Sequence, residues 1–189
     1  MAGVWVSIHS STGDRLRDRG FLRAAVEALL PGASIPPVRQ RCVDCGGDHG
    51  QPLVGDGDAV WASLTRAGGV VAVAVSTAGP VGIDLEDPLV LARAPLDAFG
   101  SDELALIRAS RDSANTAARL WTAKEAILKA DGRGLRCDPR DLRLGVEPLA
   151  LLRWDDCPVP LDGVVIDGFD GPSGLVGTVA GFPVRDRLR

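Results

Sequence analysis

The stretch VGIDLE, residues 81–86, ends in an alternation of apolar and acidic side chains. On an extended strand, successive side chains point to opposite faces. Asp84 and Glu86 therefore share one face of the predicted strand, and Ile83 and Leu85 share the other. A glycine-proline turn precedes the stretch and a proline follows shortly after it, which places the two acids near a strand end, where ligands often bind.

A second stretch, WTAKEAILK at residues 121–129, has the composition of a helix. Glu125 and Lys129 are four residues apart and share one helical stripe, which an ordinary surface ion pair would also explain. Such a helix does not explain the following run, KADGRGL at residues 129–135, whose basic, glycine-rich turn suits a phosphate-bearing ligand. Three carboxylates beside such a turn fit a Mg²⁺ site shared with substrate phosphates.

Together the two stretches resemble the signature motifs of the 4'-phosphopantetheinyl transferases of the type that activates nonribosomal peptide and polyketide synthases. Those motifs read hydrophobic-Gly-hydrophobic-Asp-x-Glu and Trp/Phe-x-x-Lys-Glu-x-x-x-Lys, and both are complete here. The resemblance implies an α+β fold of two pseudo-symmetric lobes, each a small antiparallel sheet with packed helices, with the active site at the seam. We therefore expect a single domain over residues 1–189, with lobes at approximately residues 1–80 and 81–189.

The resemblance also implies roles for individual residues at the matching positions. It makes Asp84, Glu86 and Glu125 the ligands of a Mg²⁺ cofactor. Glu125 is in addition the candidate catalytic base, and Lys129 is expected to stabilise the phosphoryl oxygens. Lys129 and Lys124 are the expected contacts for the phosphates of coenzyme A.

The segment RCVDCGGDHGQP, residues 41–52, allows two interpretations. Cys42, Cys45 and His49 have the spacing of three zinc ligands, as in a zinc-binding interaction module. A structural zinc site usually has four protein ligands, and the other histidine and cysteines are remote in the sequence. On this ground we expect no stoichiometric zinc.

In the second interpretation, which follows from the resemblance, this segment lies against coenzyme A. Cofactor contacts are then expected from Arg41, Gly50, Gln51 and Pro52. Family members commonly carry a lysine where this chain has Gln51, so one charge directed at a phosphate is absent.

A third element of the family matches the run SLTRAG, residues 63–68. Thr65 keeps the hydroxyl of that element, and Arg66 replaces a histidine that would contact the 3'-phosphate of the nucleotide. Arginine binds phosphate through two parallel hydrogen bonds, so Thr65 and Arg66 are expected to bind the cofactor. An ordinary surface position in a hairpin is the alternative for Arg66.

Composition limits the function classes. The chain has 189 residues, 46% of them hydrophobic, and a net charge of −4. A sequence-independent nucleic-acid binder carries a basic excess, so we expect no nucleic acid as a partner. No run approaches the ~20 apolar residues of a membrane helix, and the cysteines show no disulfide framework, so we expect a cytoplasmic protein without membrane contact. Arg15, Arg17, Arg19 and Arg23 form an early cluster, which is either a solvated helix surface or a cradle for phosphates.

Hydrophobic periodicity predicts the remaining elements. Strands are expected at residues 3–8, 59–64 and 70–75, and helices at residues 14–30 and 113–130, with another helix beginning at Ser101. Residues 34–57 are expected to form a loop. Short apolar runs predict a second small sheet from strands at residues 142–146, 149–154, 164–166 and 175–179.

The function that follows is Mg²⁺-dependent transfer of 4'-phosphopantetheine from coenzyme A to a serine of an acyl or peptidyl carrier protein, releasing adenosine 3',5'-bisphosphate. Coenzyme A is the co-substrate, an apo carrier protein is the partner, and the enzyme is expected to be a monomer. Two alternatives stay open. One is a coenzyme A-binding homologue with weak or no transferase activity, which Gln51, Arg66 and a short N-terminal region favour. The other is the zinc-binding interaction module.

Overall fold

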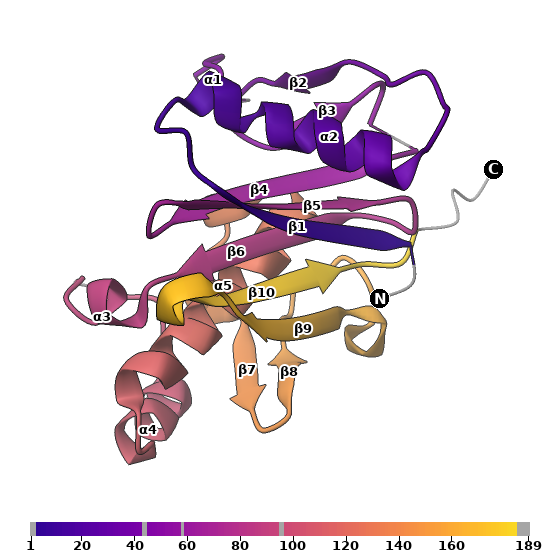
Figure 1. The fold of residues 1–189 in the computed structure, drawn as a ribbon. Coiled ribbons are helices and arrows are strands. Elements are labelled where there is room, and N and C mark those ends of the chain that lie inside the picture. The colour runs from indigo at the N-terminus through magenta and orange to yellow at the C-terminus, as the bar shows by residue number, and fades with distance from the viewer. Residues whose placement is uncertain (1–2, 43–44, 58, 95–96, 185–189) are drawn as a thin grey trace.

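A computed structural model describes residues 3–42, 45–57, 59–94 and 97–184 of the chain (Figure 1). The architecture is α+β, as the sequence predicts, and is built on two main antiparallel sheets of five and three strands. Helices α1 and α2 lie at one end of the molecule, and α4 lies at the other end with a separate two-stranded ribbon (Figure 1). None of the helices in the described residues is long and apolar enough to cross a membrane.

The five-stranded sheet comes from the first part of the chain. Its order is β1-β5-β4-β3-β2, made of β1 (Val4–Ser10), β5 (Val70–Ser76), β4 (Trp61–Ala67), β3 (Pro52–Val54) and β2 (Val38–Gln40). The apolar face of α2 (Gly20–Leu29) covers this sheet, with Leu22 and Val26 packed among the valines of β5. Burial of this face is the main force that holds the helix on the sheet.

Two expectations for this region are wrong. The single helix expected over residues 14–30 is divided at Arg19 into α1 (Arg15–Asp18) and α2. The segment expected to be a loop at residues 34–57 contains β2 and β3, which pair with each other and extend the sheet. Strands of three residues carry too little periodicity to be read from a segment rich in glycine and proline.

The second sheet has the order β6-β10-β9, from β6 (Val81–Glu86), β10 (Val176–Gly181) and β9 (Val165–Asp170). The long helix α5 (Ser113–Asp131) packs on it, preceded by α3 (Pro88–Leu91) and α4 (Ser101–Ala109). The ribbon pairs β7 (Arg143–Val146) with β8 (Leu149–Arg153). The remaining elements are short 3₁₀ turns, η1 (Gly134–Arg136), η2 (Pro139–Asp141), η3 (Leu161–Gly163) and η4 (Pro172–Gly174).

The two sheets meet where β6 lies beside β4 and β5. Ala72 and Ala74 of β5 pack in one apolar cluster with Ile83 and Leu85 of β6. The backbone N–H of Ile83 donates to Oγ of Ser63 on β4 at 3.1 Å. The apolar face of β6 is therefore buried in the joint between the sheets. The division between the two sheets falls between Ser76 and Val81; the organisation as one domain with two pseudo-symmetric lobes stays a prediction.

Candidate active site

The position of the acidic residues depends on a close crossing of β6 over α5. A Cβ atom added to Gly82 would lie 1.9 Å from the carbonyl oxygen of Ala126. The strand therefore rests directly on the helix backbone, an approach that only glycine permits. Because Ala126 lies between Glu125 and Lys129 on the helix, this crossing brings both side chains beside the end of β6.

Asp84 is the centre of the resulting cluster. Its side chain is 4% exposed, and Oδ1 accepts hydrogen bonds from Oγ1 of Thr65 at 2.9 Å and from Nζ of Lys129 at 2.5 Å. Nζ of Lys129 also lies 3.9 Å from Oε2 of Glu125. The second oxygen of Asp84, Oδ2, is buried without a hydrogen-bond partner, an arrangement that is costly for a polar atom.

The two glutamates of the cluster have raised pKa values. Burial is the main cause for Glu86, the negative charges of Asp84 and Glu125 add to it, and Trp121 and Lys129 oppose it. Burial is again the main cause of the raised pKa of Glu125, where Lys129 opposes the shift and Asp84 adds to it. Each carboxylate thus disfavours the charge of its neighbours, and a single lysine only partly compensates.

This donor set fits a hard divalent cation, which prefers carboxylate oxygens. The buried, unpartnered Oδ2 of Asp84 is the observation that favours a missing positive partner. In the described residues, one group of three possible metal ligands has its ligand atoms within 4.8 Å of one another, and it lies outside this cluster. The oxygens of the three carboxylates are therefore farther apart than this distance. Cation binding would require these carboxylates to come closer than they are here.

The segment expected to contact coenzyme A borders this cluster. Nε2 of Gln51 donates to the backbone carbonyl of Lys129 at 3.4 Å, and a Cβ atom on Gly132 would lie 2.8 Å from Oε1 of Gln51. Gln51 thus covers the C-terminal end of α5. Arg41 and Gly50 are exposed.

Arg66 follows Thr65 on β4, so its side chain points to the opposite face of the strand from that of Thr65. Its Nε donates to Oδ2 of the buried Asp18 at 3.1 Å, and its side chain remains 32% exposed. A hydrogen bond from the backbone N–H of Thr12 is the largest cause that holds the pKa of Asp18 well below its usual value, and Arg66 contributes to it. The guanidinium is therefore held in place by a charged carboxylate and still reaches solvent.

Arg19 and Arg23 of the early arginine cluster line a cavity of about 250 Å³, together with Arg39 of β2. The acidic cluster does not contribute to the lining of this cavity. The other two early arginines, Arg15 and Arg17, are exposed on α1.

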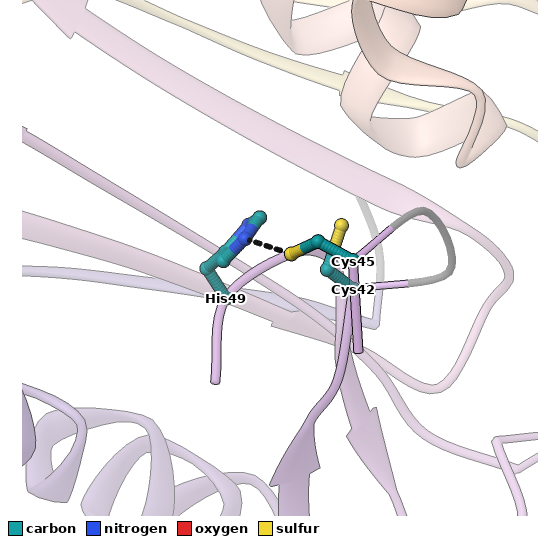
Figure 2. Close-up of side chains that lie close together, drawn as sticks. All are labelled: Cys42, Cys45 and His49. Carbon is teal, nitrogen blue, oxygen red and sulfur yellow. Dashed lines mark hydrogen bonds between the residues drawn. The ribbon is translucent and has the colours of Figure 1, made fainter. Parts of the chain in front are cut away.

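Among the described residues, the group of possible metal ligands consists of Cys42, Cys45 and His49. Their ligand atoms all lie within 4.8 Å of one another. Figure 2 shows the imidazole of His49 turned toward the sulfur of Cys45, with 2.9 Å between Nε2 and Sγ. The sequence placed these residues close together along the chain, and the fold directs their side chains to one point.

Comparison with known proteins bears on the acidic cluster. Residues 80–157 match the family model of the 4'-phosphopantetheinyl transferase superfamily. Over this region the chain is similar to that superfamily. The matched region contains β6, α5 and all of the acids of the cluster.

The chain is also similar to individual curated proteins. The chain is 36% identical over 91 residues to the 4'-phosphopantetheinyl transferase AcpT of Salmonella typhi, covering 46% of this chain and 47% of AcpT. It is 33% identical over 139 residues to the protein YieE of Escherichia coli K12, covering 68% of this chain and 52% of YieE. The chain thus spans about half the length of the curated relatives that it matches.

The structure gives Lys124 a different role from the expected one. Its side chain is fully buried, and Nζ donates to Oε2 of Glu103 at 2.7 Å and to the carbonyls of Ala98 and Pro139. All three ammonium protons are used inside the protein, so Lys124 does not contact phosphates. It instead ties α5 to α4 and to the turn before β7.

Two further residues expected to contact the cofactor are buried. Thr65 donates its hydroxyl to Asp84 and so orients this carboxylate. Pro52 is buried in β3, whereas Arg41, Gly50 and Gln51 of the same motif are exposed. Sequence reasoning missed both because a position on a strand does not say which neighbouring element covers it.

Sequence reasoning also missed Glu103 and Trp121. Glu103 is buried, closes the start of α4 through the N–H of Gly100, and pairs with Lys124. The only signal in the sequence was its place in the first turn of a helix, which favours a capping role. Trp121 lowers the pKa of Glu86 by a side-chain hydrogen bond, and its place in the helix motif was its one signal.

Proposed function

We propose that this protein catalyses the Mg²⁺-dependent transfer of 4'-phosphopantetheine from coenzyme A to a serine of an acyl or peptidyl carrier protein. The observation that carries the proposal is the pairing of Lys129 with Asp84 at the crossing of β6 and α5, with Oδ2 of Asp84 buried and unpartnered. The match of residues 80–157 to the superfamily model and the similarity to AcpT support it.

Asp84, Glu86 and Glu125 would hold the Mg²⁺ ion. When bound, the ion supplies positive charge that neutralises the pyrophosphate of coenzyme A and stabilises the leaving group. The three carboxylates alone cannot provide this, because they repel a phosphate. Thr65 keeps Asp84 in position through its hydroxyl.

Glu125 is proposed as the base, directly or through a water molecule. The carrier serine loses its proton to this carboxylate, and its oxygen forms a bond to the phosphorus that carries pantetheine. The bond between that phosphorus and the bridging oxygen breaks, and adenosine 3',5'-bisphosphate leaves with the electron pair. The place of Glu125 beside Lys129 and Asp84 puts this carboxylate next to the groups that would hold the substrate phosphates and the ion.

Lys129 is proposed to bind the phosphoryl oxygens. Its ammonium lies between Asp84 and Glu125, so it would need little reorganisation to meet a phosphoryl group bound at these carboxylates. Such placement contributes more to phosphoryl transfer than covalent chemistry does.

Coenzyme A would lie along Gln51, Gly50 and Arg41 at the end of α5, with its 3'-phosphate at Arg66. The exposed part of the Arg66 guanidinium is available for this contact while Asp18 holds the other part. The apo carrier protein is the proposed macromolecular partner, and a monomer suffices for the reaction because all proposed residues come from one chain.

The experiment is incubation of the protein with coenzyme A, Mg²⁺ and a panel of apo acyl and peptidyl carrier proteins, followed by intact-mass spectrometry. A gain of one phosphopantetheine per carrier, lost with EDTA and with Asp84→Asn, is expected. Binding of coenzyme A without transfer to any carrier would overturn the proposal in favour of a coenzyme A-binding homologue.

A further inference from the structure

The loop between β2 and β3 carries a cluster that the proposed transfer reaction does not use. Cys42, Cys45 and His49 bring two sulfurs and one imidazole nitrogen within 4.8 Å of one another (Figure 2). In a tetrahedral zinc site, with bonds of about 2.3 Å to sulfur and about 2.0 Å to nitrogen, ligand atoms lie about 3.5–3.8 Å apart. The separation of 2.9 Å between Sγ of Cys45 and Nε2 of His49 needs to open by less than 1 Å, about the size of a rotamer adjustment, to reach this range.

The backbone of the loop is shaped around the sulfurs. The N–H of Gly46 donates to the carbonyl of Cys42 at 2.9 Å, and the N–H of Cys42 donates to the carbonyl of Gly47 at 2.8 Å. Gly46 has φ +69°, which glycine adopts without strain. These two hydrogen bonds hold Gly46 and Gly47 beside Cys42.

Gly47 lies against two of the possible ligands, Cys45 and His49. Its N–H donates to Sγ of Cys45 at 3.4 Å, a contact that stabilises a negatively charged sulfur and orients it. A Cβ atom on Gly47 would lie 3.2 Å from this sulfur and 3.2 Å from Cδ2 of His49. The absence of a side chain here lets both ligands approach.

We propose that Cys42, Cys45 and His49 bind one Zn²⁺ ion, with water in the fourth position. Thiolate ligands select zinc over magnesium, since Mg²⁺ prefers oxygen. The expectation of no stoichiometric zinc rested on the lack of a fourth protein ligand. Three protein ligands and a water also make a well-known kind of zinc site, and Cys45 and His49 are exposed, which leaves room for that water.

The ion would tie down the segment that leads to the active site. After His49 the chain passes Gly50, whose carbonyl accepts from Nε2 of Gln40 at 2.9 Å, and reaches Gln51 over the end of α5. On the other side, Arg19 donates to the carbonyl of Asp48. Zinc would therefore stabilise the loop between the first sheet and α5. The inference does not depend on the transferase activity.

The test is titration of reduced, metal-free protein with Co²⁺, which replaces Zn²⁺ and has visible absorption, together with elemental analysis of protein purified without chelators. We expect one zinc per chain, thiolate-to-cobalt charge-transfer bands, and loss of those bands on adding one equivalent of Zn²⁺. Excess Mg²⁺ should leave the bands unchanged.

Cys45→Ser and His49→Ala are the test variants, and Cys157→Ser, outside the cluster, is the matched control. Loss of an outer partner of a metal ligand already weakens binding by about 10–100-fold, so loss of a ligand should weaken zinc binding by more than about 100-fold. Zn²⁺ should raise the Tm of wild type and Cys157→Ser and not that of Cys45→Ser. The absence of thiolate bands in wild type, or equal bands in Cys45→Ser, would overturn the proposal whatever the outcome of the transfer assay.

Discussion

Nζ of Lys129 donates to Oδ1 of Asp84 at 2.5 Å across the contact between α5 and β6. Oδ2 of the same carboxylate is buried and unpartnered. The lysine therefore supplies positive charge to one side of Asp84 only. A divalent cation and Lys129 would both be attracted to this carboxylate, and the predictions for the active site follow from that competition.

Lys129→Ala should separate metal binding from transfer. Loss of an electrostatic donor to the reacting group typically costs about 10²–10³ in rate, so transfer should fall by about 100-fold or more. Mg²⁺ binding should become tighter, because the competing ammonium is gone. Isothermal titration with Mg²⁺ and the carrier-mass assay measure the two effects, with Arg93→Ala as the surface control. Weaker Mg²⁺ binding in Lys129→Ala would show that the ion does not share the site of the ammonium.

The raised pKa values of Glu86 and Glu125 predict a pH dependence of the metal-free protein. Above the ordinary glutamate pKa of 4.5, the folded state retains protons that the unfolded state has released. The free energy of unfolding should therefore fall as pH rises from this value through the folded-state pKa values. The lowered pKa of Asp18 acts in another window, since its contribution is lost when pH falls below its usual value of 3.8.

Urea denaturation between about pH 4 and pH 8, a range that covers the window of the two glutamates and excludes that of Asp18, measures this effect. The variant Glu86→Gln with Glu125→Gln should lose less stability on raising the pH than wild type does. Mg²⁺ should reduce the loss in wild type and leave the variant unchanged. Identical slopes for the two proteins would mean that these carboxylates are not desolvated in the folded state.

Gly82→Ala should disrupt the active site by separating β6 from α5. The added Cβ would meet the carbonyl of Ala126 at 1.9 Å, and two backbones cannot move apart without exposing the core between them. Overpacking costs about 1–3 kcal/mol and sometimes more, so a loss above about 3 kcal/mol is expected. Thermal denaturation measures it. Gly20→Ala, which meets nothing within 4 Å, should change stability by no more than about 1 kcal/mol.

Lys124→Met should destabilise the protein although Lys124 is not a phosphate contact. The substitution removes the nearest cation of the buried Glu103 and leaves only Arg143, whose Nη1 lies 3.9 Å from Oε2. Breaking a buried pair costs about 3–5 kcal/mol. Adding Glu103→Gln removes the unpaired charge and should recover part of the loss. Chemical denaturation of both variants measures the free energy of unfolding and so the coupling between Lys124 and Glu103. A double variant that is less stable than Lys124→Met would contradict an unpaired charge as the cause.

Arg66→Ala tests the position of the 3'-phosphate. Hydrogen bonds between charged groups contribute about 1.5–3 kcal/mol, and about 1.4 kcal/mol is a factor of ten in affinity. Wild type should therefore prefer coenzyme A over dephospho-coenzyme A by about tenfold or more, and Arg66→Ala should lose this preference. Titration calorimetry with both ligands measures it. Equal weakening of both ligands would point to the cavity lined by Arg19, Arg23 and Arg39.

The sequence by itself determined the elements that carry the acidic cluster. The alternation around Asp84 predicted β6, and the helical spacing of Glu125 and Lys129 predicted α5, because such patterns depend on neighbours within one strand or a few helical turns. The α+β class and the superfamily followed from the same residues. Strands as short as β2 and β3 were missed, since they exist only through pairing with a sheet formed elsewhere in the chain.

Tertiary structure decided what each side chain faces. Lys124 and Glu125 are adjacent in one motif, yet one is buried against Glu103 and the other borders Asp84, because successive helical residues point about 100° apart. Thr65 became a partner of Asp84 only because β4 lies beside β6. Cys42, Cys45 and His49 show the same limit, since their spacing suggested ligands and only the folded loop shows that their ligand atoms converge. Local patterns in a sequence specify local geometry, whereas contacts between distant residues depend on how the elements pack.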